Sequence, residues 1–181
     1  QGSSRAVMLG DAVRMNAVSF APTGAHIAAG GNDNTVTILC CKSQSNVASF
    51  INEGRVRAMA WSPCGTRLVA GGNDSRVTLY DMTAMCKIRS FRMRGILRSL
   101  SWSPDSSLVA SGGDDKRVCV HNIETNNIVH TIKTSYKINC VCFSPCGNML
   151  AVGTNTLATV WDLRENTLNN SEDVALPCSH Q

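Results

Sequence analysis

Aromatic residues are scarce in this chain. They make up only 5% of its 181 residues, whereas hydrophobic residues as a whole make up 43%. Most of any core must therefore be built from Val, Ile, Leu, Ala, Met and Cys. Charged residues contribute 17%, and the formal net charge of +4 is too small to indicate a nucleic-acid-binding protein by itself. The hydrophobic fraction excludes general disorder and predicts a globular fold with a sizeable core.

Long apolar segments are also missing. No run of 18 apolar residues occurs in the chain, so no transmembrane helix is expected. Residues 1–5 lack the layout of a signal peptide, in which positive charge precedes an apolar stretch. We therefore expect an intracellular protein, located in the cytoplasm or the nucleus. The first residue is not Met, which suggests a fragment or a processed piece of a longer chain.

Cysteine, by contrast, is abundant, with nine residues in the chain. A disulfide-rich secreted domain and a reduced intracellular protein are both compatible with that number. The count is odd, and Cys119, Cys140 and Cys142 lie inside apolar runs. Both observations favour the reduced form, in which cysteine serves as a small core residue.

The 3.6-residue apolar periodicity of helices is absent, and a much longer repeat takes its place. Short triplets, either aromatic-Ser-Pro or Phe-Ala-Pro, begin at Phe20, Trp61, Trp102 and Phe143, each 41 residues after the one before. Equal steps with matching neighbours on both sides indicate four copies of one structural unit.

Each copy contains short apolar runs separated by turn residues. In the second copy the anchor Trp61 is followed by a turn at residues 62–65, where Pro63 and Gly65 suit a β-turn. A second turn, Gly-Gly-Asn-Asp at residues 71–74, contains residue types that tolerate the positive φ of tight hairpins. This pattern predicts a four-stranded antiparallel meander. The expected strands lie near residues 15–20, 26–30, 35–40 and 46–51, and again at intervals of 41.

A four-stranded unit that repeats every ~40 to 45 residues is typical of a propeller blade. The Ser-Pro-x-Gly and Gly-Gly-Asn-Asp segments, together with Val-Trp-Asp at residues 160–162, resemble the WD40-repeat family. The resemblance implies an all-β fold of about four four-stranded antiparallel blades within a larger, usually seven-bladed, propeller. It assigns residues 1–165 to the repeat region, with residues 5–9 as the outer strand of a preceding blade, and leaves residues 166–181 as a polar, irregular tail. The four aromatic anchors should occupy equivalent positions between neighbouring blades.

Several positions typical of that family hold other residues here. The family's His, which would hydrogen-bond to the Asp of the second turn, is absent from all four copies, although Asp33, Asp74 and Asp115 are present. The position of the closing Trp is filled, in chain order, by Leu39, Tyr80, His121 and Trp161. The blades are therefore expected to depend on apolar packing and strand pairing, with His121 as a packed or rim residue.

Catalytic and metal-binding patterns are missing. The four histidines fall at unrelated repeat positions, and Cys140, Cys142 and Cys146 lack the spacing of a zinc-binding Cys-x-x-Cys pair. The Gly-Gly pairs recur at hairpin turns rather than forming a phosphate-binding loop, and no Gly-x-Ser-x-Gly elbow occurs. We expect a protein that is not an enzyme and that needs no cofactor and no metal.

Basic residues recur at the entrance to the innermost strand of each copy, which the resemblance places at one open end of the ring. The residues six and four positions before the anchors are basic in five of eight cases, and Asn or Asp precedes the turn Asp beside them. The candidate partner-binding residues are Arg14, Arg55, Arg57, Arg98, Lys137, Asn32, Asn73 and Asp114. Arg55, Arg57 and Arg98 should form the centre. Arg55 and Arg57 should also point the same way, because they are two apart on a strand.

Two interpretations of these charges stay open: a solvated rim, and a face that docks acidic or phosphorylated peptides through arginine. We expect a protein-protein interaction scaffold of an intracellular complex, whose partners are other proteins and the propeller blades missing from this chain. The alternative is a propeller that binds phosphoinositide or nucleic-acid phosphate, of which nucleic acid is the less expected at this net charge. The Phe-Arg-Arg-Gly motif of phosphoinositide-binding propellers is only approximated at residues 91–95, where Met93 separates the two arginines.

Overall fold

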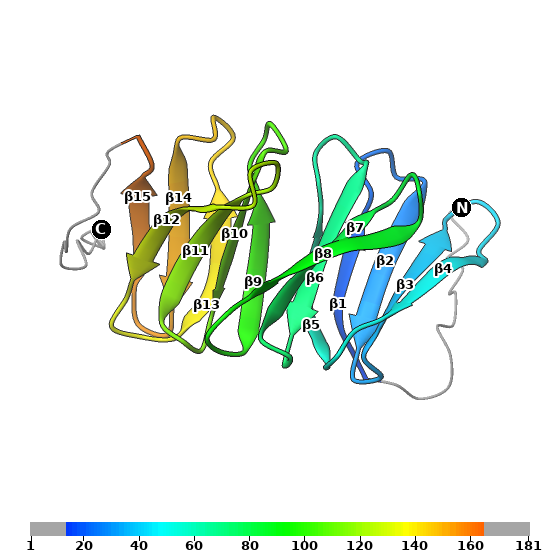
Figure 1. Cartoon of the computed structure of the whole chain (residues 1–181), viewed down its shortest axis with the longest axis horizontal. Coiled ribbons are helices and arrows are strands. Elements are labelled where there is room, and N and C mark those ends of the chain that lie inside the picture. Colours follow the sequence, from blue (N-terminus) through cyan, green and yellow to red (C-terminus); the bar gives the residue numbers. More distant parts are fainter. Residues whose placement is uncertain (1–13, 165–181) are drawn as a thin grey trace, which may run out of the picture.

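Four antiparallel sheets stand side by side in chain order in the computed structural model, which describes residues 14–164 (Figure 1). The first sheet contains β1 (Met15–Phe20), β2 (His26–Gly31), β3 (Thr35–Cys40) and β4 (Asn46–Ile51). The second contains β5 (Val56–Trp61), β6 (Arg67–Gly72), β7 (Arg76–Asp81) and β8 (Cys86–Arg92). The third contains β9 (Leu97–Trp102), β10 (Leu108–Gly113), β11 (Arg117–Asn122) and β12 (Ile128–Lys133). The fourth contains β13 (Ile138–Phe143), β14 (Met149–Thr154) and β15 (Ala158–Asp162).

These sheets, named blades 1 to 4 from here on, confirm the all-β prediction and the predicted strand positions. Within each blade the strands pair in sequence order, so each blade is a meander. No helix occurs between residues 14 and 164, and hence none that could cross a membrane. Blade 4 has three strands among the described residues. The outer strand expected near residues 5–9 and the tail expected at residues 166–181 lie outside them.

The turn after each anchor has the predicted chemistry. Its glycine adopts positive φ in three blades, at Gly24, Gly65 and Gly147. In blade 3 the same position is Ser106, with φ of 62°. Glycine is favoured at such a position because a side chain strains the left-handed backbone.

The Gly-Gly pairs have a different role from the one predicted. Positive φ falls on the residue after the turn Asp, at Asn34, Ser75 and Lys116, so the expectation for the Gly-Gly pairs was wrong. In each pair, the second glycine is the last residue of its strand and lies against the start of the inner strand. A Cβ on Gly72 would lie 2.0 Å from the carbonyl oxygen of Arg55, which explains why no side chain is present there.

The core consists of three apolar clusters, one between each pair of adjacent blades. Alternate residues of an inner strand pack toward the blade on one side and the blade on the other, as expected for a pleated strand. In β5, Met59 and Trp61 pack toward blade 1, whereas Ala58 and Ala60 pack toward blade 3. Each blade therefore depends on its neighbours for burial.

The aromatic anchors are equivalent in three blades. The indole nitrogens of Trp61 and Trp102 donate hydrogen bonds to carbonyl oxygens of the preceding inner strand, at 3.2 and 2.9 Å. Phe143 is also buried, but it has no such donor. Phe20 is 63% exposed, so its predicted place between blades was wrong: no described segment precedes blade 1 to cover it.

Serine hydroxyls join blades 3 and 4 where the indole is missing. The hydroxyl of Ser99 accepts a hydrogen bond from the backbone nitrogen of Val141 at 3.0 Å, and that of Ser101 from the nitrogen of Phe143 at 3.1 Å. Between blades 3 and 4, hydrogen bonds to serine hydroxyls thus replace the indole hydrogen bond found between the other blades.

The cysteines differ in burial according to the side of the strand on which they lie. Cys119 is buried in the core as predicted, whereas Cys140 and Cys142 are exposed on the side of β13 that faces away from blade 3. The expectation of core residues was therefore wrong for Cys140 and Cys142, because no described blade follows blade 4. All cysteines between residues 14 and 164 are free thiols.

Other residues form buried contacts at the positions where the residues typical of the WD40-repeat family are absent. The Tyr80 hydroxyl donates a short hydrogen bond to the side-chain oxygen of Asn52, and both residues are buried. His121 is 3% exposed and its ring lies 4.8 Å from that of Phe91, which confirms the prediction of a packed residue. Burial lowers the pKa of His121 to about 4.

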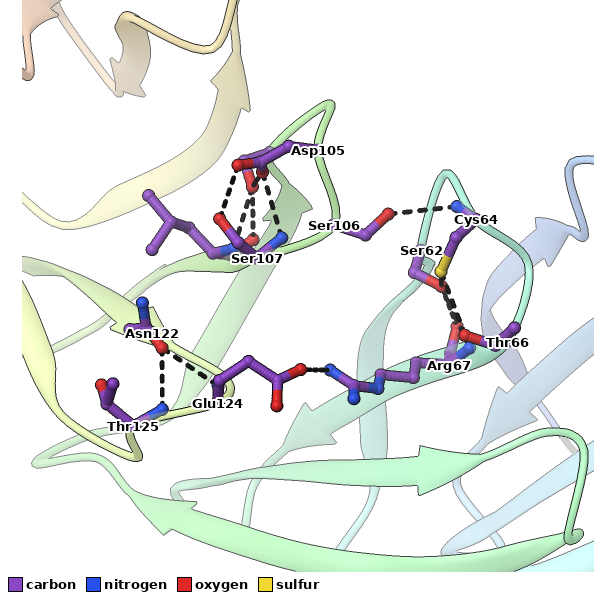
Figure 2. A network of polar contacts seen from close by, with 12 residues as sticks. Ser62, Cys64, Thr66, Arg67, Asp105, Ser106, Ser107, Asn122, Glu124 and Thr125 are labelled. Carbon is purple, nitrogen blue, oxygen red and sulfur yellow. Dashed lines mark hydrogen bonds and ion pairs between the residues drawn. The ribbon is translucent and has the colours of Figure 1, made fainter.

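A polar network links blades 2 and 3 at the rim where the inner strands end (Figure 2). Arg67 of β6 forms an ion pair of 2.7 Å with Glu124 of the β11–β12 turn. The thiol of Cys64 lies 3.2 Å from the hydroxyl of Ser62 and 3.0 Å from that of Thr66. Burial raises the pKa of the Cys64 thiol, but the hydrogen bonds with Ser62 and Thr66 outweigh this effect and lower it to about 6.

Candidate functional site

The start of each inner strand carries a β-bulge. The register between inner and second strands slips by one residue in every blade, for example between Val56 and Ala58 in blade 2. The extra residues are Asn16, Arg57, Arg98 and Asn139. A bulge breaks the alternation of side chains and re-aims the inserted one. All four inserted residues are polar and exposed.

Each bulge residue forms a hydrogen bond with the residue sixteen positions later, at the turn between the second and third strands of its own blade. The amide of Asn16 donates to the side-chain oxygen of Asn32 at 3.0 Å. The Nε of Arg57 donates to Asn73, and the Nε of Arg98 to Asp114, both in short contacts. The amide of Asn139 donates to Asn155 at 2.6 Å. The four blades thus present one repeated pair with four different chemistries.

The bulge side chains converge on one depression of about 390 Å³ at this end of the blades. Its lining residues are Arg14, Met15, Asn16, Arg57, Arg98 and Asn139. All four blades contribute to this set. The described residues of the lining include three guanidinium groups and no carboxylate, so they make the depression positively charged.

In the part of the chain that the structure describes, one carboxylate forms ion pairs with the basic residues predicted to bind a partner. Asp114 accepts from Arg98 and lies 3.4 Å from the ammonium group of Lys137. The hydrogen bond from Arg98 is the main reason that the pKa of Asp114 is held below its usual value, with Lys137 adding to the effect. Arg57 is held instead by the neutral amide of Asn73, so its charge is not balanced by its partner.

Both bulge arginines are held through Nε alone. No hydrogen bond joins the terminal nitrogens of Arg57 or Arg98 to another residue between 14 and 164. A guanidinium anchored in this way keeps its two terminal nitrogens for a ligand, and that edge matches a carboxylate or phosphate. The arrangement can therefore bind an anion without prior rearrangement.

The structure brings together part of the predicted set. Arg14, Arg57 and Arg98 share the depression. The turn residues predicted beside them are their partners or neighbours, as described for Asn32, Asn73 and Asp114, and Lys137 lies alongside through Asp114. Arg55 is exposed but does not line the depression, although Arg14, at the equivalent position of blade 1, does. A role in binding stays a prediction for all eight residues.

Sequence reasoning missed the bulges and the pairing of Asn139 with Asn155. A signal for the bulge was present. Gly31, Gly72 and Gly113 stand opposite the bulged segment, and glycine inside a strand often marks a bulge or a close backbone approach.

The described residues contain no group of three His, Cys, Asp or Glu side chains placed to hold a metal ion. Cys140 and Cys142 do share an exposed face, but the structure adds no third ligand to them within residues 14–164. The described residues that line the depression include neither a nucleophile nor a general base.

Two family models match the chain. The model of the WD domain, G-beta repeat, matches residues 4–38 and 44–81, and the model of the anaphase-promoting complex subunit 4 WD40 domain matches residues 100–162. A comparison with curated proteins gave no match. WD40 domains are in general non-catalytic platforms that bind other proteins. Both models describe WD40 repeats and their matches fall on the blades described above, so the chain belongs to the WD40-repeat family.

Proposed function

We propose that this chain is a non-catalytic interaction scaffold of an intracellular complex. Its arginine face, defined as Arg14, Arg57 and Arg98, docks an acidic or phosphorylated segment of a partner protein. The observation that carries the proposal is the convergence of these three arginines on one depression, where no carboxylate occurs among the lining residues that the structure describes. Like charges gathered in this way repel one another, and an anionic partner relieves that repulsion. One matching model is named for a subunit of a multiprotein complex, which agrees with a scaffold role.

The lining argues for a protein partner over the alternatives. Of the lining residues between 14 and 164, Met15 is the only apolar one and none is aromatic, so nucleic-acid bases would find no surface there on which to stack. The phosphoinositide motif approximated at residues 91–95 is interrupted by Met93, which is buried. Its neighbours Arg92 and Arg94 are exposed but are not adjacent in the chain.

Charge reversal tests the proposal. The double variant Arg57→Glu/Arg98→Glu should retain the melting temperature of the parent protein, since both side chains are exposed. It should lose at least about tenfold in affinity for a fluorescent glutamate-rich model peptide, because charge-paired contacts are replaced by repulsion. Binding of that peptide is measured by fluorescence anisotropy at low salt.

The matched control is Arg92→Glu/Arg94→Glu. It changes the net charge equally at two exposed arginines that do not line the depression. Equal loss of affinity in both double variants would show that only the overall charge matters. Unchanged affinity in Arg57→Glu/Arg98→Glu would show that the arginine face is a solvated rim.

A further inference from the structure

We infer that the arginine face selects a phosphate monoester on a serine or threonine side chain of its partner, in preference to a carboxylate. This inference rests on the proposed function and narrows it. It follows from the charge of the depression, the way in which the arginines are held, and the residue types that line it.

The charge balance favours a dianion. Among the described lining residues and the groups ion-paired with them, Arg14, Arg57, Arg98 and Lys137 supply four positive charges and Asp114 supplies one negative charge, which leaves an excess of three. A carboxylate would offset one of these charges. A phosphate monoester carries a charge of about −1.5 to −2 near neutral pH and offsets up to twice as much.

The geometry favours three acceptor oxygens over two. Arg57 and Arg98 come from adjacent blades, and each is fixed through Nε while its terminal nitrogens stay unbonded among the described residues. One carboxylate has two oxygens, which a single guanidinium can occupy in a bidentate pair. A phosphate monoester has three terminal oxygens, so it can accept from both guanidinium groups at once. Because Asn73 and Asp114 already hold the arginines, little side-chain freedom is lost on binding.

The lining favours an aliphatic phosphorylated side chain. Asn16 and Asn139 flank the arginines with amide groups, and the described part of the lining contains no aromatic residue. A phosphotyrosine ring or a nucleotide base would therefore meet polar amides and charged groups rather than a stacking surface. Phosphoserine and phosphothreonine place their phosphate on a short stem that needs no such surface.

Arg57 and Arg98 should contribute unequally to phosphate binding. Arg98 shares Asp114 with Lys137, so part of its charge is already compensated. Arg57 is held by a neutral amide and keeps its full charge for the ligand. Loss of the charge at Arg57 should therefore weaken phosphate binding more than the same loss at Arg98.

The experiment compares three fluorescent peptides that share one glutamate-rich sequence and differ at a central position, which is Ser, Glu or phosphoserine. Anisotropy titrations should give an affinity for the phosphoserine peptide roughly tenfold above that for the Glu peptide. Arg57→Gln should remove most of this preference, Arg98→Gln should remove less, and Arg92→Gln, at an exposed arginine outside the depression, should leave it unchanged. Arg57→Lys keeps the charge without the planar fork and should also reduce the preference. A melting curve for each variant checks that it is folded.

The outcomes separate the inference from the proposed function. Equal affinity for the Glu and phosphoserine peptides, lost in Arg57→Gln, would overturn the phosphate preference while the acidic-peptide function stands. Failure of all three peptides to bind would overturn both. Vesicles containing a phosphatidylinositol phosphate form a further arm. If they bind in an Arg57-dependent way while the phosphoserine peptide does not, the phosphate source is a lipid headgroup and the inference is wrong.

Discussion

The Nε of Arg98 donates a hydrogen bond to the Oδ1 of Asp114, which joins the bulge at the start of β9 to the turn after β10. The same sixteen-residue pair occurs in all four blades, although the residues are Asn with Asn, Arg with Asn, Arg with Asp, and Asn with Asn. The bulge therefore sets where the pair lies, whereas the residue types set its charge. This separation allows one blade geometry to present different chemistry at each position around the depression.

The first prediction concerns the carboxylate of this pair. Arg98→Gln should raise the pKa of Asp114 toward its usual value, because the hydrogen bond and charge of Arg98 are the main cause of its lowered pKa. Protonation of Asp114 would then occur at higher pH than in the parent protein. An NMR titration of the side-chain carboxyl measures the change. Arg55→Gln is the control, and an equal rise there would mean that the shift reflects the general charge of the face.

The second prediction concerns buried His121. Its pKa is about 4 in the folded protein, below its ordinary value of 6.5, because burial disfavours the charged form. The stability associated with neutral His121 is therefore complete above the unfolded pKa and declines as the pH falls from 6.5 toward 4. Between about pH 7.5 and pH 5 this loss should be about 2 kcal/mol.

His121→Phe should flatten this decline, since the replacement cannot be protonated and still packs against Phe91. It also removes the Nε2 atom, which is buried without a hydrogen-bond partner among the described residues. Urea unfolding at both pH values gives the free energies of unfolding. A variant with the same pH dependence as the parent protein would assign the decline to other groups.

Much of the fold could be predicted from the sequence because the repeat is encoded in local chemistry. The turn residues and aromatic anchors recur with a constant step, so the strands of all four blades follow from the anchor positions. Exposure could not be predicted in the same way. Phe20 and Cys140 occupy positions that are buried in a middle blade, but burial depends on a neighbouring blade that the repeat alone does not supply.

The candidate site was predictable in position but not in detail. Counting residues before each anchor located Arg57 and Arg98 correctly at one end of the blades. The strict alternation of a strand then led to Arg55 as an equal member, whereas of the two only Arg57, the bulge residue, lines the depression. A bulge depends on pairing with the next strand, so the pattern of one strand does not reveal it.

The third prediction concerns the reactivity of Cys64. Its thiol is exposed and has a pKa of about 6, so most of it is thiolate near neutral pH. Iodoacetamide should therefore modify Cys64 earlier than the exposed Cys86, by roughly severalfold in rate. Thr66→Val removes one of the hydrogen bonds that lower the pKa and should slow the reaction at Cys64 alone. Mass spectrometry of timed samples follows each site. Equal rates at both cysteines would contradict the proposed stabilisation of the thiolate.

The fourth prediction concerns the contact between blades 3 and 4. Ser99→Ala/Ser101→Ala should leave the backbone nitrogens of Val141 and Phe143 without acceptors at an interface that also buries the Phe143 ring. An unpaired buried donor costs about 1 to 3 kcal/mol, so the double variant should lose about 2 to 4 kcal/mol of unfolding free energy. Ser49→Ala, at an exposed serine of the outer strand β4, is the control and should change stability little.

The loss of stability in Ser99→Ala/Ser101→Ala should be local, because blades 1 to 3 keep their own contacts through the indoles of Trp61 and Trp102. Hydrogen exchange should therefore accelerate first at the amides of β13 and only later at those of β5. Uniform acceleration across the blades would instead mean that the sheets unfold as one unit and that the serine contacts do not act on blade 4 alone.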